Sequence, residues 1–138
     1  MDVPLAVLAD SAIASNDGKL SVIGIFNKIN APGFPVVHPQ CTLVLQLRAA
    51  PGERGQQKRV LIRLMDEDSV LVDMASEFQV PDQFEDPHSP FVINQILQMH
   101  GLAFPRAGEY AFHVLINEEE KASVRFQVVR LQPETPAT

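Results

Sequence analysis

The chain has 138 residues, of which 46% are hydrophobic, and a formal net charge of −6. A chain of this size and composition can bury a core of its own, which excludes a wholly disordered protein; we expect one domain over residues 1–131 and a disordered tail over residues 132–138. The acidic balance, with no basic cluster larger than Lys58-Arg59, indicates a protein that does not bind nucleic acid.

Cys41 is the single cysteine, so neither a disulfide within the chain nor a cysteine zinc cluster can form. No stretch approaches the roughly 18–20 apolar residues of a membrane-spanning helix. The first residues lack the basic region of a signal peptide. These features predict a cytoplasmic protein without membrane contact.

The first predicted element is a long hairpin with arms Leu5–Ala14 and Lys19–Ile29. Asp17-Gly18 between two apolar runs is a strong hairpin signal, because Gly18 accepts the positive φ that tight turns require. A two-residue turn and a three-residue turn are both compatible with the sequence. They differ in register by one residue and therefore in which side chains share a face.

Asp10 interrupts the first apolar arm. A carboxylate among apolar neighbours needs hydrogen-bond donors or a place at a sheet edge. We expect a structural role for Asp10, with a functional carboxylate as the alternative.

Six more strands follow, separated by polar or proline-rich loops: Cys41–Ala49, Lys58–Met65, Val70–Val80, Phe91–His100, Glu109–Asn117 and Ala122–Leu131. Apolar and polar residues alternate along most of them, as in half-buried strands. The apolar residues of Phe91–His100 also fit one face of a helix. We favour a strand, because the neighbouring elements are strands and no helix-capping residue precedes the segment. Eight strands with longer crossings near residues 31–40 and 81–90 predict an all-β fold, an antiparallel β-sandwich with Greek-key or jelly-roll-like connections.

Three groups of residues carry a resemblance: Ala9-Asp10 with Asp17-Gly18-Lys19-Leu20 and Gly24-Ile25-Phe26; Phe34-Pro35 with His38-Pro39; and Phe104-Pro105, Gly108, Tyr110 and Phe112. The chain resembles an uncharacterised bacterial family of small β-sandwich proteins that open with an Ala-Asp…Gly-Lys-Leu…Gly-Ile-Phe hairpin. The resemblance covers most of the chain and implies the sandwich fold. It implies no activity, substrate or catalytic residue.

Tyr110 follows Pro105 and Gly108 at the start of a late strand. This arrangement is similar to the entry of the penultimate strand in many immunoglobulin-like and carbohydrate-binding sandwiches, where a tyrosine hydroxyl bonds the backbone across a corner. We therefore expect Tyr110 to fasten such a corner rather than to stack on a ligand.

No motif in the chain indicates catalysis. There is no Gly-x-Ser-x-Gly nucleophile turn and no glycine-rich phosphate loop before a helix, and the four histidines are widely spread. Asp66-Glu67-Asp68 is typical of a solvated turn, since a calcium site needs more converging oxygens. We expect no catalytic residue, no cofactor and no metal site.

The apolar first hairpin is the element best suited to extend a sheet across a subunit boundary. We therefore expect a non-catalytic assembly or adaptor module that acts through protein–protein contacts, with a homo-oligomer as one form. The alternative is a small-ligand or carbohydrate-binding module that uses the loops 31–40, 50–57 and 81–90, with Phe34, Phe84 and His88 as candidate binding residues. An enzyme of unknown type is the third hypothesis.

Overall fold

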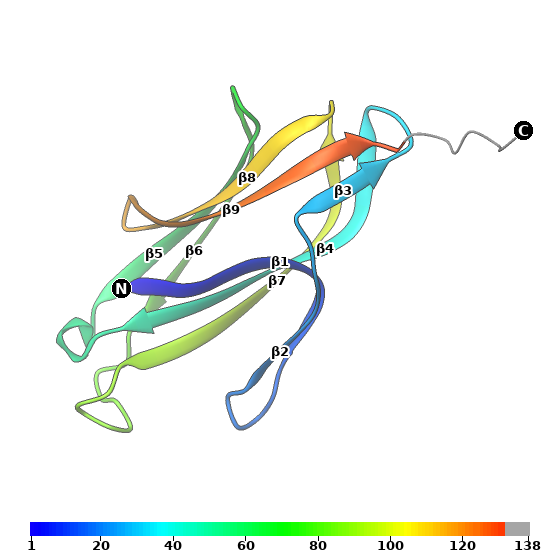
Figure 1. The fold of residues 1–138 in the computed structure, drawn as a ribbon. Helices are drawn as coiled ribbons and strands as arrows, with labels where there is room; N and C mark the ends of the chain where they lie inside the picture. The colour runs from blue at the N-terminus through cyan, green and yellow to red at the C-terminus, as the bar shows by residue number, and fades with distance from the viewer. Residues whose placement is uncertain (132–138) are drawn as a thin grey trace, which may run out of the picture.

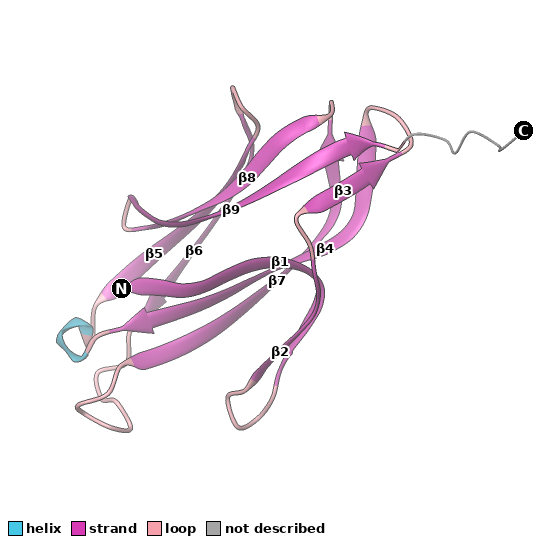
Figure 2. Cartoon of the chain, viewed as in Figure 1, coloured by secondary structure: helices cyan, strands magenta, loops and turns pink. Residues whose placement is uncertain are grey.

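A computed structural model describes residues 1–131, and the predicted disordered tail lies outside the described residues. Residues 1–131 form nine strands in two packed sheets and one short 3-10 helix (Figures 1 and 2). The elements are β1 (Asp2–Ala14), β2 (Leu20–Ile25), β3 (Lys28–Ala31), β4 (Val36–Ala49), η1 (Pro51–Glu53), β5 (Gln57–Met65), β6 (Val70–Gln79), β7 (Phe91–Phe104), β8 (Gly108–Ile116) and β9 (Glu119–Arg130). Within these residues no helix has the length and hydropathy needed to cross a membrane.

Sheet A has the strand order β2-β1-β4-β7, and sheet B has the order β3-β9-β8-β5-β6. The chain changes sheet between β2 and β3, between β3 and β4, between β4 and β5, between β6 and β7, and between β7 and β8, and such crossings are typical of a Greek-key sandwich. The predicted all-β sandwich is confirmed. Phe91–His100 is a strand, as favoured from its neighbours, and it continues to Phe104.

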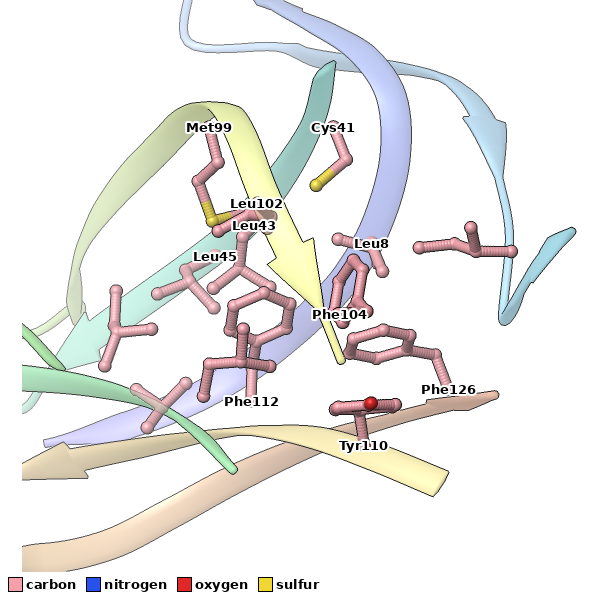
Figure 3. Close-up of a cluster of buried hydrophobic side chains, with 14 of the residues drawn as sticks. Leu8, Cys41, Leu43, Leu45, Met99, Leu102, Phe104, Tyr110, Phe112 and Phe126 are labelled. Atoms are coloured by element: carbon pink, nitrogen blue, oxygen red, sulfur yellow. The ribbon is translucent and has the colours of Figure 1, made fainter. Parts of the chain in front are cut away.

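The core lies between the sheets because alternate residues of each inner strand are apolar. Leu43, Leu45 and Leu47 of β4 are fully buried, and Phe112 and Val114 of β8 are fully buried in the same cluster. Figure 3 shows this cluster, with side chains from both sheets interdigitating. Period-two alternation thus places one face of each sheet in a common apolar layer.

The predicted arm Lys19–Ile29 is wrong as a single strand. β2 ends at Ile25, the chain passes from sheet A to sheet B, and β3 then pairs in parallel with the end of β9. The amide of Gln127 donates to the carbonyl of Asn27 at 2.9 Å, which fixes the crossing. Residues 1–131 therefore contain nine strands rather than eight, and one pairing is parallel. Apolar alternation continues through both pieces, so it does not reveal a change of sheet.

The structure also selects one of the two turns that the sequence allowed. Ala14 pairs with Leu20, and the amide of Ser15 donates to the carbonyl of Lys19 at 2.8 Å, so the loop has three residues. Gly18 has a φ of 84°, the left-handed conformation that closes a three-residue hairpin loop.

The far end of the β1–β2 hairpin covers part of the outer face of sheet A. Thr42 and Val44 alternate with the core leucines of β4 and so point away from the core, yet both are fully buried. The Asn94 side chain of β7 donates to the carbonyl of Gly18 at 3.2 Å, so the hairpin turn reaches the opposite edge strand. Figure 1 shows the hairpin bending away from the line of β1. One face of the hairpin is therefore turned toward the sheet and the other toward solvent.

A group of buried and partly buried charges joins the N-terminus, η1 and β5. The Glu53 carboxylate accepts hydrogen bonds from the N-terminal ammonium of Met1, from the amide of Ala50 at 2.7 Å and from the Lys58 ammonium at 3.2 Å. Lys58 is only 6% exposed. Burial opposes ionisation of Glu53, but these donors outweigh it and lower the pKa of the carboxyl from its ordinary value of 4.5 to about 2.

The Glu53→Gln variant should lose about 2 kcal/mol of unfolding free energy at pH 7, because charged hydrogen bonds to Lys58 and to the N-terminus are lost. The folded-state pKa lies below the unfolded one, so this contribution is complete above about pH 5 and falls as the pH drops toward 2. Urea unfolding of both proteins at pH 7, 5 and 3 measures the difference. The control is Asp2→Asn, which removes an exposed ion pair with Arg48 and should change stability by less than about 0.5 kcal/mol. A stability difference that does not shrink with falling pH would contradict the assignment.

Candidate functional site

Tyr110 lies at the corner between β7 and β8. Its hydroxyl donates to the carbonyl of Arg106 at 2.6 Å, and its ring is 2% exposed. The ring packs edge-on against Phe104 and stacks with Phe126 (Figure 3). Burial raises the pKa of the Tyr110 hydroxyl above its ordinary value. This geometry ties the corner together and leaves no ring face open to a ligand.

Asp10 is exposed and lies where β1 and β2 run side by side. Its carboxylate sits over Gly24, where a Cβ atom would lie 2.3 Å from an oxygen of Asp10. Gly24 also has a φ of 71°, so a glycine is required there for two reasons. Asp10 thus occupies the surface of the hairpin beside the Gly24 backbone.

Of the three loops predicted to form a common rim, 50–57 and 81–90 come together, and the loop in 31–40 lies apart from them. The loop before β4 lies at one end of the sandwich, and the loop before β7 lies at the other end beside η1 (Figure 1). Phe34 is half-buried and packs on the core, whereas Phe84 is 8% exposed and stacks on Phe91 with ring centroids 5.5 Å apart. His88 is exposed. Phe34 is therefore far from Phe84 and His88, and the two phenylalanines serve packing.

Three isoleucines form an exposed apolar face on the β1–β2 hairpin. Ile13, Ile23 and Ile25 are 61%, 56% and 64% exposed. In the observed register Ile23 lies opposite Ser11 and Ile25 opposite Ala9, and directly opposite residues point to the same side of a sheet. We call these three residues the isoleucine face.

Two residues of the isoleucine face, Ile23 and Ile25, lie on β2, an edge strand without charged residues, and Ile13 lies on the adjacent strand β1. β2 has the sequence LSVIGI, whereas the edge strands of sheet B carry Lys28 in β3 and Asp73 and Glu77 in β6. β7, the other edge of sheet A, also has no aspartate, glutamate, lysine or arginine. Among its described residues, however, Val92 is the one large hydrophobic side chain that is exposed, whereas β2 exposes both Ile23 and Ile25. Charged side chains on an edge discourage pairing with another strand. Sheet A therefore presents its most accessible apolar edge at β2.

The outer face of sheet B contains a hollow with a volume of about 650 Å³. Residues from β3, β8, β9 and the β5–β6 turn line it, among them Lys28, Glu67, Glu109, Ala111, Arg125 and Gln127. We call this hollow the sheet B groove. Sequence reasoning did not select it, because its residues come together only through the pairing of β3 with β9.

Asp66 forms one wall of the sheet B groove and is held by its own turn. Its carboxylate accepts hydrogen bonds from the amides of Asp68 and Ser69 at 2.8 and 2.6 Å, and Arg106 lies 3.3 Å away. The two amides and Arg106 lower the pKa of this carboxyl, although burial opposes them. Asp66 thus stabilises the turn and shapes the groove.

Over residues 1–131 no three histidine, cysteine or acidic side chains lie close enough to hold a metal ion. Cys41 is 1% exposed, and burial raises the pKa of its thiol to about 11. Such a thiol is a small core residue rather than a nucleophile.

A family model described as "Family of unknown function (DUF6941)" matches residues 4–129 of the chain. No curated protein matches the chain. Among solved structures, the chain is similar to the Pseudomonas fluorescens alkylpurine DNA glycosylase AlkC bound to DNA containing an abasic site analog, with 14% sequence identity and a TM-score of 0.46. That match covers 89% of this chain and spans 30% of the glycosylase.

The Tyr110→Phe variant should lose about 1–2 kcal/mol of unfolding free energy, because the carbonyl of Arg106 loses the hydroxyl donor at a buried corner. Urea unfolding followed by far-ultraviolet circular dichroism measures the loss. Ser89→Ala, which removes an exposed hydroxyl bonded to Asp86, serves as the control and should stay within about 0.5 kcal/mol of the parent. A Tyr110→Phe protein as stable as the parent would show that the bond does not hold the corner.

Proposed function

The chain belongs to the family of unknown function DUF6941, and we propose that it is a non-catalytic assembly module that self-associates through the β1–β2 hairpin. The observation that carries this proposal is the isoleucine face beside the free edge of β2, a strand that has no charged residue. Clustered apolar side chains on a protein surface mark contact surfaces more often than isolated ones do.

The hairpin offers two kinds of contact to a second copy. The outer edge of β2 presents the backbone amides and carbonyls of Leu20–Ile25, which can pair with the same strand of another molecule. The isoleucine face lies beside that edge and supplies apolar area to bury. Hydrogen bonds between the two β2 strands set the relative orientation of the two molecules. Burial of the isoleucine face supplies most of the free energy of association.

A twofold axis at β2 would make this contact self-complementary. Two copies of β2 would run antiparallel, and sheet A of each molecule would continue into sheet A of the other. Such a pairing closes the two β2 edges at once. It leaves sheet B, with its charged edges, facing solvent on both molecules.

Light scattering after size-exclusion chromatography tests the proposal over a range of protein concentrations. The parent protein should be a dimer, and Ile23→Lys should be a monomer, because a buried unpaired ammonium at the contact is strongly unfavourable. Val37→Lys is the matched control, since Val37 is 62% exposed on β4 and lies outside the hairpin. It should remain a dimer.

Both substitutions are at exposed positions, so circular dichroism should show unchanged folding and thermal unfolding within a few degrees. A parent protein that is monomeric at high concentration would overturn the proposal. A dimer that survives Ile23→Lys would place the contact elsewhere on the molecule.

A further inference from the structure

The sheet B groove is built from rows of side chains that cross the strands. Lys28 of β3 pairs with Gln127 of β9, and Gln127 pairs with Glu109 of β8, so these three residues form one row on the outer face. In the next row Arg125 of β9 lies opposite Ala111 of β8. The small side chain of Ala111 lies between longer neighbours, which explains why the sheet is hollow at this place.

Opposite charges line opposite sides of the groove. Lys28 and Arg125 stand on β3 and β9, whereas Glu109 stands on β8 and Glu67 on the β5–β6 turn. None of these four side chains forms an ion pair with any residue in the described part of the chain, although other charges of sheet B, such as Arg63 and Asp73, do. Their charged groups are therefore available to a bound molecule.

The strand order sets the distance between the two kinds of charge. Adjacent strands in a sheet lie about 4.7–4.9 Å apart. Lys28 and Glu109 are two strands apart in the same row, so their backbone positions are roughly 10 Å apart across the sheet. Glu67, beyond β5, extends the acidic side further in the same direction.

From this arrangement we infer that the sheet B groove binds a short peptide with free termini. Its carboxylate lies against Lys28 and Arg125, and its ammonium lies against Glu109 and Glu67. An extended chain spans about 3.3–3.6 Å per residue, so a tripeptide matches the separation of roughly 10 Å. The volume of about 650 Å³ is within the usual size of small-molecule sites, about 300–1,000 Å³.

Two details of the lining favour an extended peptide over a single amino acid. The α-ammonium and carboxylate of one amino acid are too close together to reach both sides of the groove. The Gln127 amide stands between Lys28 and Glu109 and can exchange hydrogen bonds with a peptide group in the middle of the ligand. The site lies in the opposite sheet from the isoleucine face, so it does not depend on self-association.

Isothermal titration calorimetry with four probes tests the inference: trialanine, its N-acetyl form, its C-terminal amide and free alanine. Trialanine should bind most tightly. Each blocked form should bind about tenfold more weakly, because it loses one charge-assisted contact. Free alanine should bind more weakly than either blocked form.

Variants then assign each end of the peptide. Lys28→Gln should weaken trialanine binding about tenfold and should reduce the difference between trialanine and its amide, since the carboxylate has lost one of its two cationic partners. Glu109→Gln should likewise weaken trialanine binding about tenfold, and it should reduce the difference between trialanine and its N-acetyl form, since the ammonium has lost one of its two acidic partners. Lys19→Gln, on the exposed hairpin turn, is the matched control and should leave all four affinities unchanged.

Amide chemical shifts in nuclear magnetic resonance spectra locate the bound peptide, and those of Ala111 and Gln127 should move. No heat and no shift with trialanine, equal affinity for all four probes, or shifts confined to residues outside the groove would each overturn the inference.

Discussion

The contact between Phe104 of sheet A and the aromatic residues of sheet B holds the two layers together. The Phe104 ring meets Tyr110 and Phe126 edge-on, with centroids 4.9 and 5.8 Å away, while Phe126 stacks on both Tyr110 and Phe112. Edge-to-face packing is directional, so it fixes the angle as well as the spacing of the sheets. The Tyr110 hydroxyl then binds the turn that enters β8. The position of the β5–β6 turn, and with it the wall of the sheet B groove, depends on this corner, because Arg106 in the same turn pairs with Asp66.

The two outer faces of the sandwich differ in chemistry. Sheet A carries uncharged edges and an isoleucine face, whereas the outer face of sheet B carries alternating charged and amide side chains around Ala111. Because the main core lies between the two sheets, exposed side chains on the outer faces can vary with little cost to it. This separation lets one small domain present two independent surfaces.

Strand alternation was sufficient to predict most of the fold. Val60, Ile62 and Leu64 of β5, and Tyr110, Phe112 and Val114 of β8, face the core as their period of two requires. The corner at Tyr110 could also be predicted, since Pro105 and Gly108 mark a local turn. The change of sheet between β2 and β3 could not, because it is fixed by Gln127 in the last strand. The same long-range pairing assembles Lys28, Gln127 and Glu109 into one row, and no local pattern indicates such a row.

The place of β7 in sheet A has a consequence for the order in which the protein forms during synthesis. β4 lies between β1 and β7, and its pairing with β7 runs from Val36–Phe104 to Ala49–Phe91. On the ribosome, β1, β2 and β4 emerge long before residues 91–104, so one whole side of β4 stays unpaired while the middle of the chain is translated. Through that interval the nascent chain carries an open apolar strand. Until β7 arrives, the free edge of β4 can pair with a strand of another chain.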